Sequence, residues 1–399
     1  MSTVARQSGL RSQNLSTVVR QVLAAPEAPS RADIAARTGL TRSTVSRLVD
    51  ELIAEGFLTE SPPLFDGHRG RPAVPLLPRA EGWVALGLEL NVGHTAARLV
   101  DLTGAVLQES RVEAELAGSD PAKAIRGLAR QSRKLLKAAP PDALLAGVHL
   151  ALPGLVDTSR GILLRAPNLG WHEVDARRHL SSVFGSSVPV GISNEADCAA
   201  MTISWTAPGR PSEHLDFLYV SGEHGIGSAL VNAGDVRTGR NGWAGEIGHV
   251  CVSRSGRRCG CGATGCLETY VGQAALCASA GADDAVQLRS LLEAGDQRAH
   301  AAVSDAATRL GIVLAGALNL LDVSEVVLGG HLAVIAEFLI PPVLDELRPR
   351  VLSAPFAPPR VSAVTSDPES ASLGAAYTAL QSLILEPARW MTAGVDAPA

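Results

Sequence analysis

The pattern of apolar and polar positions predicts three short helices at the start of the chain. In the first and the third, apolar residues recur at i, i+3, i+4, i+7 and i+8, which is the spacing of one helix face. These faces consist of Leu15, Val18, Val19, Val22 and Leu23 in the first helix and of Val45, Leu48, Val49, Leu52 and Ile53 in the third. Pro26 ends the first helix, and Gly56 ends the third.

A second helix lies between these two, and capping residues mark its ends. The stretch Ser30-Arg31-Ala32-Asp33 resembles a capping box, and Gly39 closes the helix. Thr41 can then cap the third helix. Two short helices joined by the tight turn Gly39-Leu40-Thr41 form a helix-turn-helix pattern, so we expect the third helix to enter the major groove of double-stranded operator DNA.

The outward face of the third helix carries hydroxyl and guanidinium groups, which suit phosphates and base edges. These residues are Arg42, Ser43, Thr44, Ser46 and Arg47. The next segment predicts a two-stranded wing from 57–60 and 74–77, with Arg69 and Arg71 at its tip. A three-helix bundle can also be a plain dimerisation or structural module, but the spacing, the arginine-bearing tip and the local charge favour DNA binding.

Charge is distributed unevenly along the chain. Residues 1–80 contain 10 Arg and no Lys against 7 Asp and Glu, a net charge of +3, whereas the rest carries 25 − 33 = −8. A basic first segment on an acidic body is typical of a protein that contacts DNA at one end. The sequence shows no run of about 18 apolar residues and no apolar leader, so we expect a cytoplasmic protein without membrane association.

From residue 81 onward the pattern changes to strands. Apolar runs predict strands at 83–90, 95–102 and 106–114, and a similar series recurs at 215–221 and 227–232. Two copies of a β-rich unit, each followed by helical stretches, predict two similar α/β lobes with a cleft between them. The tail after about Pro387 is expected to lack regular structure.

One imidazole and three thiols predict a structural zinc site. The ligand set is His249, Cys259, Cys261 and Cys266. A Cys₃His set suits tetrahedral zinc, and the glycines between the cysteines let a short loop fold around one ion. The alternative is three reduced cysteines in a glycine-rich loop, but clustering in a chain without a predicted leader favours metal. The remaining cysteines are expected in the core: Cys198, Cys251 and Cys277.

Several longer stretches now resemble one known family. They are ALPGLVDTSRGILLRAPNLGW, GISNEADCAAM, GWAGEIGHV with the zinc loop CGCGATGCLE, and VVLGGHLA. They are similar to the ROK family of repressors, uncharacterised reading frames and sugar kinases, and the resemblance covers nearly the whole chain. It implies a two-lobed, actin-like (ribonuclease H-like) α/β sugar-kinase fold. The winged helix-turn-helix in front resembles the regulator branch, because the free-standing kinases lack it.

Pattern and resemblance together predict three domains. A winged helix-turn-helix DNA-binding domain is expected at 1–80, and the N-terminal lobe of the sugar-kinase-like body at 81–205. The C-terminal lobe, with the zinc loop and dimerisation helices, is expected at 206–399. The resemblance and the usual needs of helix-turn-helix proteins imply a homodimer or homotetramer.

The resemblance also implies a sugar pocket. The residues at matching positions are Asn168, Asn194, Glu195, Glu246, His249 and Glu268. They supply acceptors and amide donors for several hydroxyls of a pyranose, and a bound zinc would fix His249 beside them. The alternative is that these polar side chains only satisfy one another or the loop backbone.

Three motifs depart from the kinases of the family. Their turn Asp-x-Gly-Gly-Thr corresponds here to Glu89-Leu90-Asn91-Val92-Gly93-His94, and their second phosphate turn, Gly-Thr-Gly-Ile-Gly, corresponds to Glu223-His224-Gly225-Ile226-Gly227. The base motif Asn-Asp-Ala-Asn reads Asn194-Glu195-Ala196-Asp197, with Glu195 at the base position. The first turn has lost both glycines, Glu223 would face a polyphosphate, and the base carboxylate of Glu195 is displaced. These departures predict a degenerate kinase without enzymatic activity.

These expectations favour a sugar-responsive transcription regulator, a repressor of carbohydrate-utilisation genes whose operator binding is controlled by a sugar or sugar derivative. Two alternatives remain at this point. The chain could be an active ATP-dependent sugar kinase with an accessory DNA-binding head. It could also be a regulator that is switched by a transporter or phosphotransferase protein instead of by a sugar.

Overall fold

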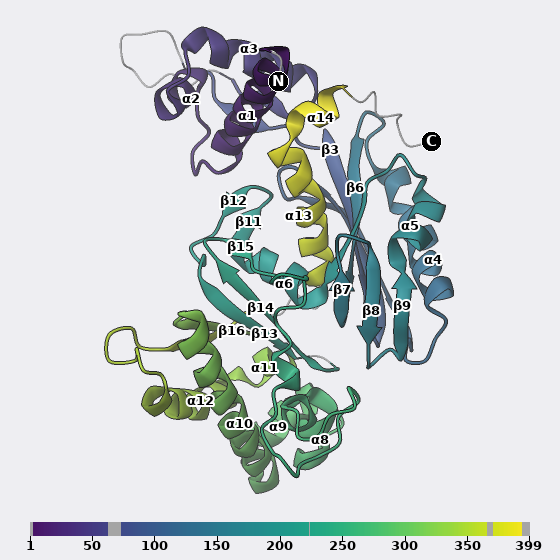
Figure 1. The fold of residues 1–399 in the computed structure, drawn as a ribbon, viewed down its shortest axis with the longest axis vertical. Helices are drawn as coiled ribbons and strands as arrows, with labels where there is room; N and C mark the ends of the chain where they lie inside the picture. The colour runs from purple at the N-terminus through teal and green to yellow at the C-terminus, as the bar shows by residue number, and fades with distance from the viewer. Residues whose placement is uncertain (1–2, 63–72, 223, 365–369, 393–399) are drawn as a thin grey trace.

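The computed structural model describes residues 3–62, 73–222, 224–364 and 370–392. These residues form a helical head, two α/β lobes and a pair of C-terminal helices that return from the second lobe to the head (Figure 1). Three residues named in the predictions above lie outside the described residues: Arg69, Arg71 and Glu223.

The head has the predicted three helices and two-stranded wing. Its helices are α1 (Thr3–Leu23), α2 (Arg31–Thr38) and α3 (Arg42–Ala54), and its antiparallel strands are β1 (Leu58–Glu60) and β2 (Leu76–Pro78). The apolar residues that predicted the faces of the first and third helices are buried in one core, apart from Ile53, which packs partly buried against it. Periodicity alone was therefore sufficient to place this domain.

The predicted helix caps of the head are confirmed. The Ser30 hydroxyl accepts a hydrogen bond from the Asp33 N–H, and the Asp33 carboxylate accepts one from the Ser30 N–H. Gly39 ends α2 with φ of 72°, and the Thr41 hydroxyl caps α3 by accepting from the Thr44 N–H. These local contacts set the sharp angle between α2 and α3 that a helix-turn-helix requires.

The first lobe contains a five-stranded sheet in the order β10-β6-β3-β4-β5. Its strands are β3 (Trp83–Leu90), β4 (His94–Asp101), β5 (Val106–Glu113), β6 (Leu144–Leu152) and β10 (Val190–Asn194). The strands β3, β4 and β5 form an antiparallel meander, and β6 and β10 add in parallel. A second, antiparallel sheet in this lobe consists of β7 (Leu155–Asp157), β8 (Ile162–Ala166) and β9 (Trp171–Asp175).

Helices cover both faces of the five-stranded sheet. On one face lie α4 (Pro121–Ser132) and α5 (Ala176–Phe184), with the short 3₁₀ helix η1 (Leu135–Ala138) after α4. On the other face lies α13 (Ser370–Leu385), which approaches closely at Gly87 because a Cβ there would collide with the Ser372 carbonyl. With both faces covered, β3 is buried along its whole length, which explains its continuous apolar run.

The second lobe repeats the connectivity of the first. Its sheet has the order β15-β14-β13-β16-β17, with an antiparallel meander followed by two parallel strands. The strands are β13 (Phe217–Gly222), β14 (Ile226–Asn232), β15 (Asp235–Val236), β16 (Glu325–Gly330) and β17 (Arg360–Ala363). The duplicated β-rich unit predicted from the strand series is therefore confirmed.

Most of the second lobe's helices pack into one large apolar core. They are α7 (Glu268–Val271), α8 (Gln273–Ala280), α9 (Ala285–Glu293), α10 (Gln297–Leu321), α11 (His331–Val334) and α12 (Ala336–Arg350), with the 3₁₀ helix η2 (Ile247–His249) before them. By length and apolar content, α10 would suffice to cross a membrane, but half of its apolar window is buried and contributes to this core. A core helix meets the same criterion.

Two helices lie between the sheets and join the lobes (Figure 1). They are α6 (Glu195–Ser204) and α13, and they pack at Gly374, where a Cβ would collide with the Cys198 carbonyl. Small residues from both helices share a core with Phe217 and Tyr219 of the second sheet. The hairpin of β11 (Trp205–Ala207) and β12 (Arg210–Pro211) follows α6 and leads into the second lobe.

Residues 387–392 differ from the prediction of an unstructured tail, and residues 393–399 lie outside the described part of the chain. Pro387–Thr392 form a helix, α14, whose Trp390 is buried. Its ring lies 5.7 Å from that of Trp83 in an edge-on arrangement, and Trp83 lies 5.4 Å from Phe57 of the head. The head, β3 and the last two helices therefore share one apolar core. This segment is ordered because aromatic partners far away in the sequence bury it.

Candidate functional site: an interlobe pocket beside a metal centre

Four ligand atoms converge where the sequence predicts a metal site. The ligand atoms of His249, Cys259, Cys261 and Cys266 all lie within 4.8 Å of one another. Cys259 Sγ is 3.8 Å from His249 Nδ1, and Cys261 Sγ is 3.7 Å from Cys266 Sγ. Thiolates bound to one tetrahedral zinc at about 2.3 Å would lie about 3.8 Å apart. The separations of 3.7 and 3.8 Å are those expected for ligands of one tetrahedral ion.

The chemistry of the donor set also fits a divalent cation. Burial, and hydrogen bonds that the Cys266 thiol donates to Cys261 and Cys259, raise the pKa of Cys266 to about 12. Thiolates crowded in this way repel one another unless a cation offsets their charge. His249 as a ligand is a neutral imidazole, so three thiolates on Zn²⁺ would leave a net charge of −1. The metal centre itself would therefore present no positive charge to its neighbours.

Glycines let the zinc loop (residues 249–266) turn back on itself. Gly262 and Gly265 have φ of 95° and 79°, and a Cβ on Gly265 would collide with the Ser253 carbonyl. An isolated antiparallel bridge pairs Cys251 with Cys266 at the base of the loop. Cys251 is exposed, so its prediction as a core residue is wrong, whereas Cys198 and Cys277 are buried as predicted.

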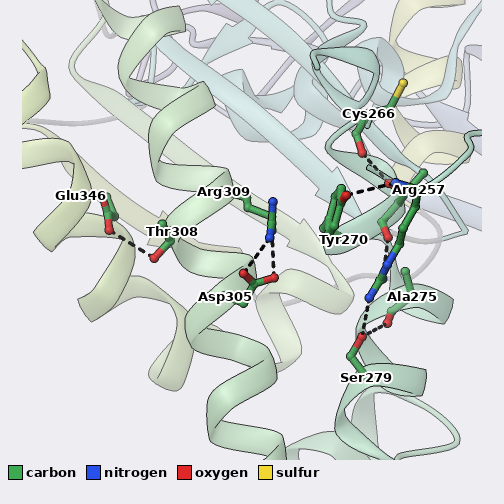
Figure 2. A network of polar contacts seen from close by, with 10 residues as sticks. Arg257, Cys266, Tyr270, Ala275, Ser279, Asp305, Thr308, Arg309 and Glu346 are labelled. Carbon is green, nitrogen blue, oxygen red and sulfur yellow. Dashed lines mark hydrogen bonds and ion pairs between the residues drawn. The ribbon is translucent and has the colours of Figure 1, made fainter. Parts of the chain in front are cut away.

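A network behind the zinc loop ties it to the helices of the second lobe (Figure 2). The Arg257 guanidinium donates to the Thr269 carbonyl at 2.9 Å, and the Thr269 hydroxyl donates to the Cys266 carbonyl at 2.8 Å. The Tyr270 ring lies between two cations, 4.9 Å from the Arg257 guanidinium and 4.0 Å from that of Arg309 on α10. These contacts fix the loop against the helices of the second lobe.

The six residues predicted for a sugar pocket line one cavity between the lobes, named here the interlobe pocket. Asn168 follows β8, and Asn194 and Glu195 begin α6. Glu246 precedes η2, His249 is its last residue, and Glu268 begins α7. The cavity has a volume of about 60 Å³. That volume holds about four to six water molecules, which is the scale of one sugar ring and not of two.

Several of these side chains already have protein partners. The Asn194 amide donates to the Gly154 carbonyl at 3.0 Å, and its oxygen accepts from the Ala196 N–H, which caps α6. Glu268 Oε2 accepts from the Ile226 N–H at 3.2 Å. A Cβ on Gly225 would collide with the Glu268 carboxylate, so the pocket depends on a bare backbone at this position.

One hydrogen bond crosses from the first lobe to the zinc loop. Arg165 of β8 donates from Nη2 to the Cys261 carbonyl at 2.8 Å. Asn168, three residues further on, lines the interlobe pocket together with Glu268 of the other lobe. The lobes are therefore joined at the edge of the pocket by a contact to the loop that carries the metal ligands.

The carboxylates around the pocket are electrostatically crowded. Burial raises the pKa of Glu246, with His249 opposing and Glu268 adding to the shift. Burial and the charge of Glu246 raise the pKa of Asp197, in the first turn of α6, to about 7. An acid of this kind is half protonated near neutral pH, so the negative charge in the first turn of α6 depends on pH.

The first phosphate turn of the kinases is replaced by side chains that bond to one another. Asn91 Nδ2 donates to Glu195 Oε2 at 2.9 Å, and Asn91 Oδ1 accepts from the Val92 N–H at 2.6 Å. His94 Nε2 lies 3.1 Å from Glu89 Oε1, and both side chains are buried. In this turn the Val92 N–H is therefore bonded to a side chain and is not free to bind a phosphate.

A much larger cavity of about 1250 Å³, named here the large cleft, adjoins the interlobe pocket and shares Glu195 and His224 with it. A Cβ on Gly93 would lie 3.0 Å from the His224 ring, so this imidazole lies against the first turn. Four carboxylates line the large cleft: Glu89, Glu113, Glu195 and Glu213. Among its described lining residues Arg111 is the single Lys or Arg, and it pairs with Glu113 at 2.9 Å.

The predicted DNA-contact face of α3 lies away from the core of the head. Arg42, Ser43 and Arg47 are exposed, and Thr44 and Ser46 are partly exposed. Arg47 is held by Glu51 at 2.9 Å, one turn further along the helix. These five side chains are brought together on one surface, whereas the two arginines predicted at the wing tip lie outside the described residues.

Sequence reasoning missed three residues that position these sites. Arg31 joins α2 to Asp50 and Glu60, and it also donates to the Ser46 carbonyl. Arg165 contacts the zinc loop, and Asn91, identified from the sequence only as a lost glycine, holds Glu195. Each of these roles depends on a partner that is distant in the sequence, so no local sequence pattern predicts it.

Comparisons with known proteins place both parts of the chain. The sequence profile described as the ROK family matches residues 85–382, and that described as the IclR helix-turn-helix domain matches residues 14–62. A candidate xylose repressor from a Caldicellulosiruptor species is 33% identical over 348 residues, which cover 82% of this chain and 84% of that protein.

Solved structures agree with this division. A ROK family transcriptional regulator, described as a homologue of the Escherichia coli Mlc protein, shares the fold with a TM-score of 0.80 at 21% identity, over 96% of this chain and 100% of that one. A ROK hexokinase from Thermus thermophilus has a TM-score of 0.61 at 29% identity and covers 75% of this chain and 99% of the hexokinase. The predicted fold, a helix-turn-helix domain before a two-lobed kinase-like body, is confirmed. The chain belongs to the ROK family.

Proposed function

We propose that this chain is a DNA-binding transcriptional repressor of carbohydrate-utilisation genes, and that a sugar in the interlobe pocket controls its operator binding. The observation that carries the proposal is the continuity of the molecule. A helix-turn-helix with an exposed polar recognition face shares its core with the kinase-like body that forms a pocket of sugar size. The names of relatives support the same function, since one of them is named for xylose repression.

On the DNA side, α3 would lie in the major groove. Arg42 and Arg47 would contact phosphates or guanine edges, and the three hydroxyl residues of the same face would pair with phosphates and bases. Arg69 and Arg71 would extend this contact from the wing. Two heads of a homodimer, or of a homotetramer built from such dimers, would read a palindromic operator with half-sites one or more helical turns apart.

On the effector side, the pocket residues would accept and donate hydrogen bonds to the hydroxyls of one sugar ring. Glu195, Glu246 and Glu268 supply carboxylate acceptors, and Asn168 supplies an amide. His249 and the three cysteines would hold a structural zinc ion, which keeps the zinc loop and Glu268 in place when bound.

Phosphoryl transfer is not part of the proposed function. Asn91 and His94 occupy the first phosphate turn, and Glu195 at the base position is one methylene longer than the aspartate of the family's kinases and is held by Asn91. The large cleft is lined by carboxylates where a nucleotide polyphosphate would need cations and bare amides. These groups support sugar binding without phosphoryl transfer.

The shared core suggests how the signal reaches the DNA. The head packs on β3, α13 and α14 of the first lobe, so closure of the second lobe would move against the head and first lobe as one body. In a dimer joined through the second lobes, that movement would change the spacing of the two heads. The sugar shifts the equilibrium only by its different affinity for the two arrangements.

The test is fluorescence anisotropy of the full-length, zinc-loaded protein on DNA from upstream of its own gene, titrated with D-xylose and D-glucose. We expect tight binding that one sugar weakens. Arg47→Ala should weaken DNA binding by about tenfold or more, as expected for a lost base or phosphate contact, and leave sugar binding unchanged. Arg289→Ala is the matched control, because Arg289 also pairs with a glutamate one turn away, Glu293 at 2.8 Å, but lies on α9.

The outcomes separate the candidate functions. DNA binding that no sugar alters would contradict sugar control and point to a protein partner as the switch. Sugar-dependent consumption of ATP would contradict the proposal and identify a kinase. Equal loss of DNA binding in Arg47→Ala and Arg289→Ala would contradict the assignment of α3 as the recognition helix.

A further inference from the structure

We propose that Cys251 and Cys266 are a peroxide-sensitive pair, and that a disulfide between them removes Cys266 from the metal ligand set. Cys266 is one of the four predicted zinc ligands, whereas Cys251 lies outside that set. The two residues face each other across the antiparallel bridge at the base of the zinc loop. The loss of metal rests on the zinc site of the proposed function, whereas the disulfide rests on the positions of the two residues alone.

The backbone places these two residues at a separation that a disulfide can span. Two backbone hydrogen bonds flank the pair, at 2.7 and 2.9 Å. They run from the Val252 N–H to the Gly265 carbonyl and from the Leu267 N–H to the Val250 carbonyl. Cys251 and Cys266 therefore form a non-hydrogen-bonded pair, whose Cα atoms lie about 4.5 Å apart with both side chains on one face. A disulfide needs Cα atoms about 4.4–6.8 Å apart.

Cys251 is the thiol that a small oxidant would reach first. Of the six cysteines, all of which the structure describes, Cys251 alone is exposed, whereas Cys266 is 1% exposed. The Cys251 thiol donates to the Thr264 carbonyl at 3.6 Å, so it lies over the strand that carries Cys266 two residues further on. Rotation about its Cα–Cβ bond to another staggered position would bring its sulfur toward Cys266.

Cys261 is the competing partner for Cys266, since their Sγ atoms are 3.7 Å apart. Both residues belong to the ligand set, so one zinc ion would hold both sulfurs and keep them from reacting with each other. Cys251 lies outside the set and has no such restraint. The expected first product of oxidation therefore joins a thiol outside the ligand set to a ligand, and does not join two ligands.

The reaction takes two steps and consumes one peroxide molecule. In the first step, the Cys251 sulfur attacks a peroxide oxygen, the O–O bond breaks, and a sulfenic acid and one water form. In the second step, the Cys266 sulfur attacks the Cys251 sulfur, the S–O bond breaks, and the hydroxyl group leaves as a second water while the S–S bond forms. The two sulfurs lose two electrons to the peroxide oxygens. The proton of the second water comes from the Cys266 thiol, or from solvent where that sulfur was bound to zinc.

The disulfide would leave three metal ligands: His249, Cys259 and Cys261. A site built for four donors then holds zinc less tightly, and a thiol or phosphine reductant would restore the missing ligand. The same loop carries the Cys261 carbonyl that Arg165 of the first lobe contacts. Under the proposed function, oxidation would therefore weaken the response to sugar, as loss of a zinc ligand does.

The experiment is hydrogen peroxide treatment of the full-length, zinc-loaded protein, followed by alkylation, trypsin digestion and mass spectrometry. Trypsin places Cys251 in peptide 241–254 and Cys266 in peptide 259–289, because arginines bound each peptide. We expect the two peptides to become linked through these cysteines and a phosphine reductant to separate them. A colorimetric chelator should detect the release of about one zinc ion per chain. A disulfide within peptide 259–289, or oxidation that leaves peptide 241–254 unlinked, would overturn the pair.

Variants separate this pair from the other cysteines. Cys251→Ser should yield no linked peptides and keep its zinc under the same peroxide treatment. Cys277→Ala changes a buried cysteine in the same peptide as Cys266 and should behave like the parent. Zinc lost equally from Cys251→Ser and from the parent would overturn the role of Cys251. Linked peptides from a protein that takes up no zinc would overturn the loss of metal and, with it, the zinc of the proposed function.

Discussion

The interlobe pocket and the large cleft lie side by side between the same two lobes, yet their residues have diverged in different ways. The pocket has about 60 Å³ and is lined by amides, carboxylates and a histidine of the metal set. The cleft has about 1250 Å³, and its phosphate turn is filled by Asn91, His94 and the ring of His224. The two cavities therefore share Glu195 but differ in volume and in the chemistry of their lining.

Under the proposed function, the difference separates the parts of a kinase-like fold that sugar recognition needs from those that phosphoryl transfer needs. Reading a sugar requires a closed polar pocket, so residues that fix its walls must stay in register across both lobes. Transferring a phosphoryl group additionally requires bare amides and cations around a polyphosphate. In this chain the walls are braced by the zinc loop and by Arg165, whereas the phosphate turn is bonded to itself. The predictions below test each side of that contrast.

The largest effect is expected from removing a metal ligand. Cys259→Ser should release zinc and loosen the loop that precedes Glu268. The sugar concentration that releases DNA should then rise by about 100-fold or more, because loss of a metal ligand is expected to have at least the effect of losing a residue that orients one. Zinc content by mass spectrometry and release by anisotropy measure the two effects. Cys251→Ser is the control, since this exposed thiol lies in the same loop outside the ligand set. Full zinc and full response in Cys259→Ser would contradict the metal site.

A single methyl group should close the pocket and spare the cleft. In Gly225→Ala the new Cβ would collide with the Glu268 carboxylate and lie 2.9 Å from the Asn168 amide, so sugar affinity should fall about 50-fold, in the range expected for misplaced binding groups. In Gly227→Ala the nearest atom is 3.4 Å away, an ordinary contact, and affinity should hold within about threefold. Calorimetry with the effective sugar compares the two. Equal loss in both variants would indicate general damage to the turn instead of a blocked pocket.

Local sequence patterns predicted the head and the metal centre well, because short-range rules govern both. The faces of α1 and α3 follow from spacing, and the caps at Ser30 and Thr41 follow from residue type. The four residues predicted to bind zinc lie on one loop, and their ligand atoms converge. In each case the deciding contacts join residues close together in the chain.

The braces of the pocket could not be predicted in this way. Asn91 and Glu195 are 104 residues apart, and Arg165 and Cys261 are 96 apart, so neither pair leaves a periodic signal. The return of the last helices to the head is similar, since α13 falls within the range predicted for the second lobe but packs on β3. Trp390 is buried against Trp83, which in turn contacts Phe57, and the sequence around residue 390 does not predict these partners.

The acid crowding around α6 gives a pH-dependent stability prediction. Asp197 has its pKa raised to about 7 by burial and Glu246, against 3.8 as the ordinary value. Below pH 4 the carboxyl is protonated in both folded and unfolded chains, and between pH 4 and 7 the unfolded chain ionises first, so this group progressively destabilises the fold as pH rises. Asp197→Asn should remove that cost, with a small gain near pH 4 and a gain of about 4 kcal/mol at pH 8, because the shift of about 3 pKa units corresponds to about 1.4 kcal/mol per unit.

Chemical unfolding of both proteins at pH 4.5 and pH 8 measures this effect. Asp142→Asn is a suitable control, because Asp142 is an exposed acid in a turn of the first lobe. A gain that is equal at both pH values would mean that packing, and not charge, separates the variant from the parent. A loss at pH 8 would mean that ionised Asp197 has a favourable partner and that the crowding is compensated.

The smallest effect is expected at the large cleft. A non-hydrolysable ATP analogue with Mg²⁺ at about 1 mM should change the affinity for sugar by less than about twofold, because a ligand without a binding site shifts no equilibrium. The reason lies in the carboxylates of the cleft, in the paired Arg111 and in the covered turn at Asn91. Calorimetric titration of sugar with and without the analogue makes the comparison. A tenfold change would show that the cleft still binds nucleotide and that the contrast between the two cavities concerns catalysis alone.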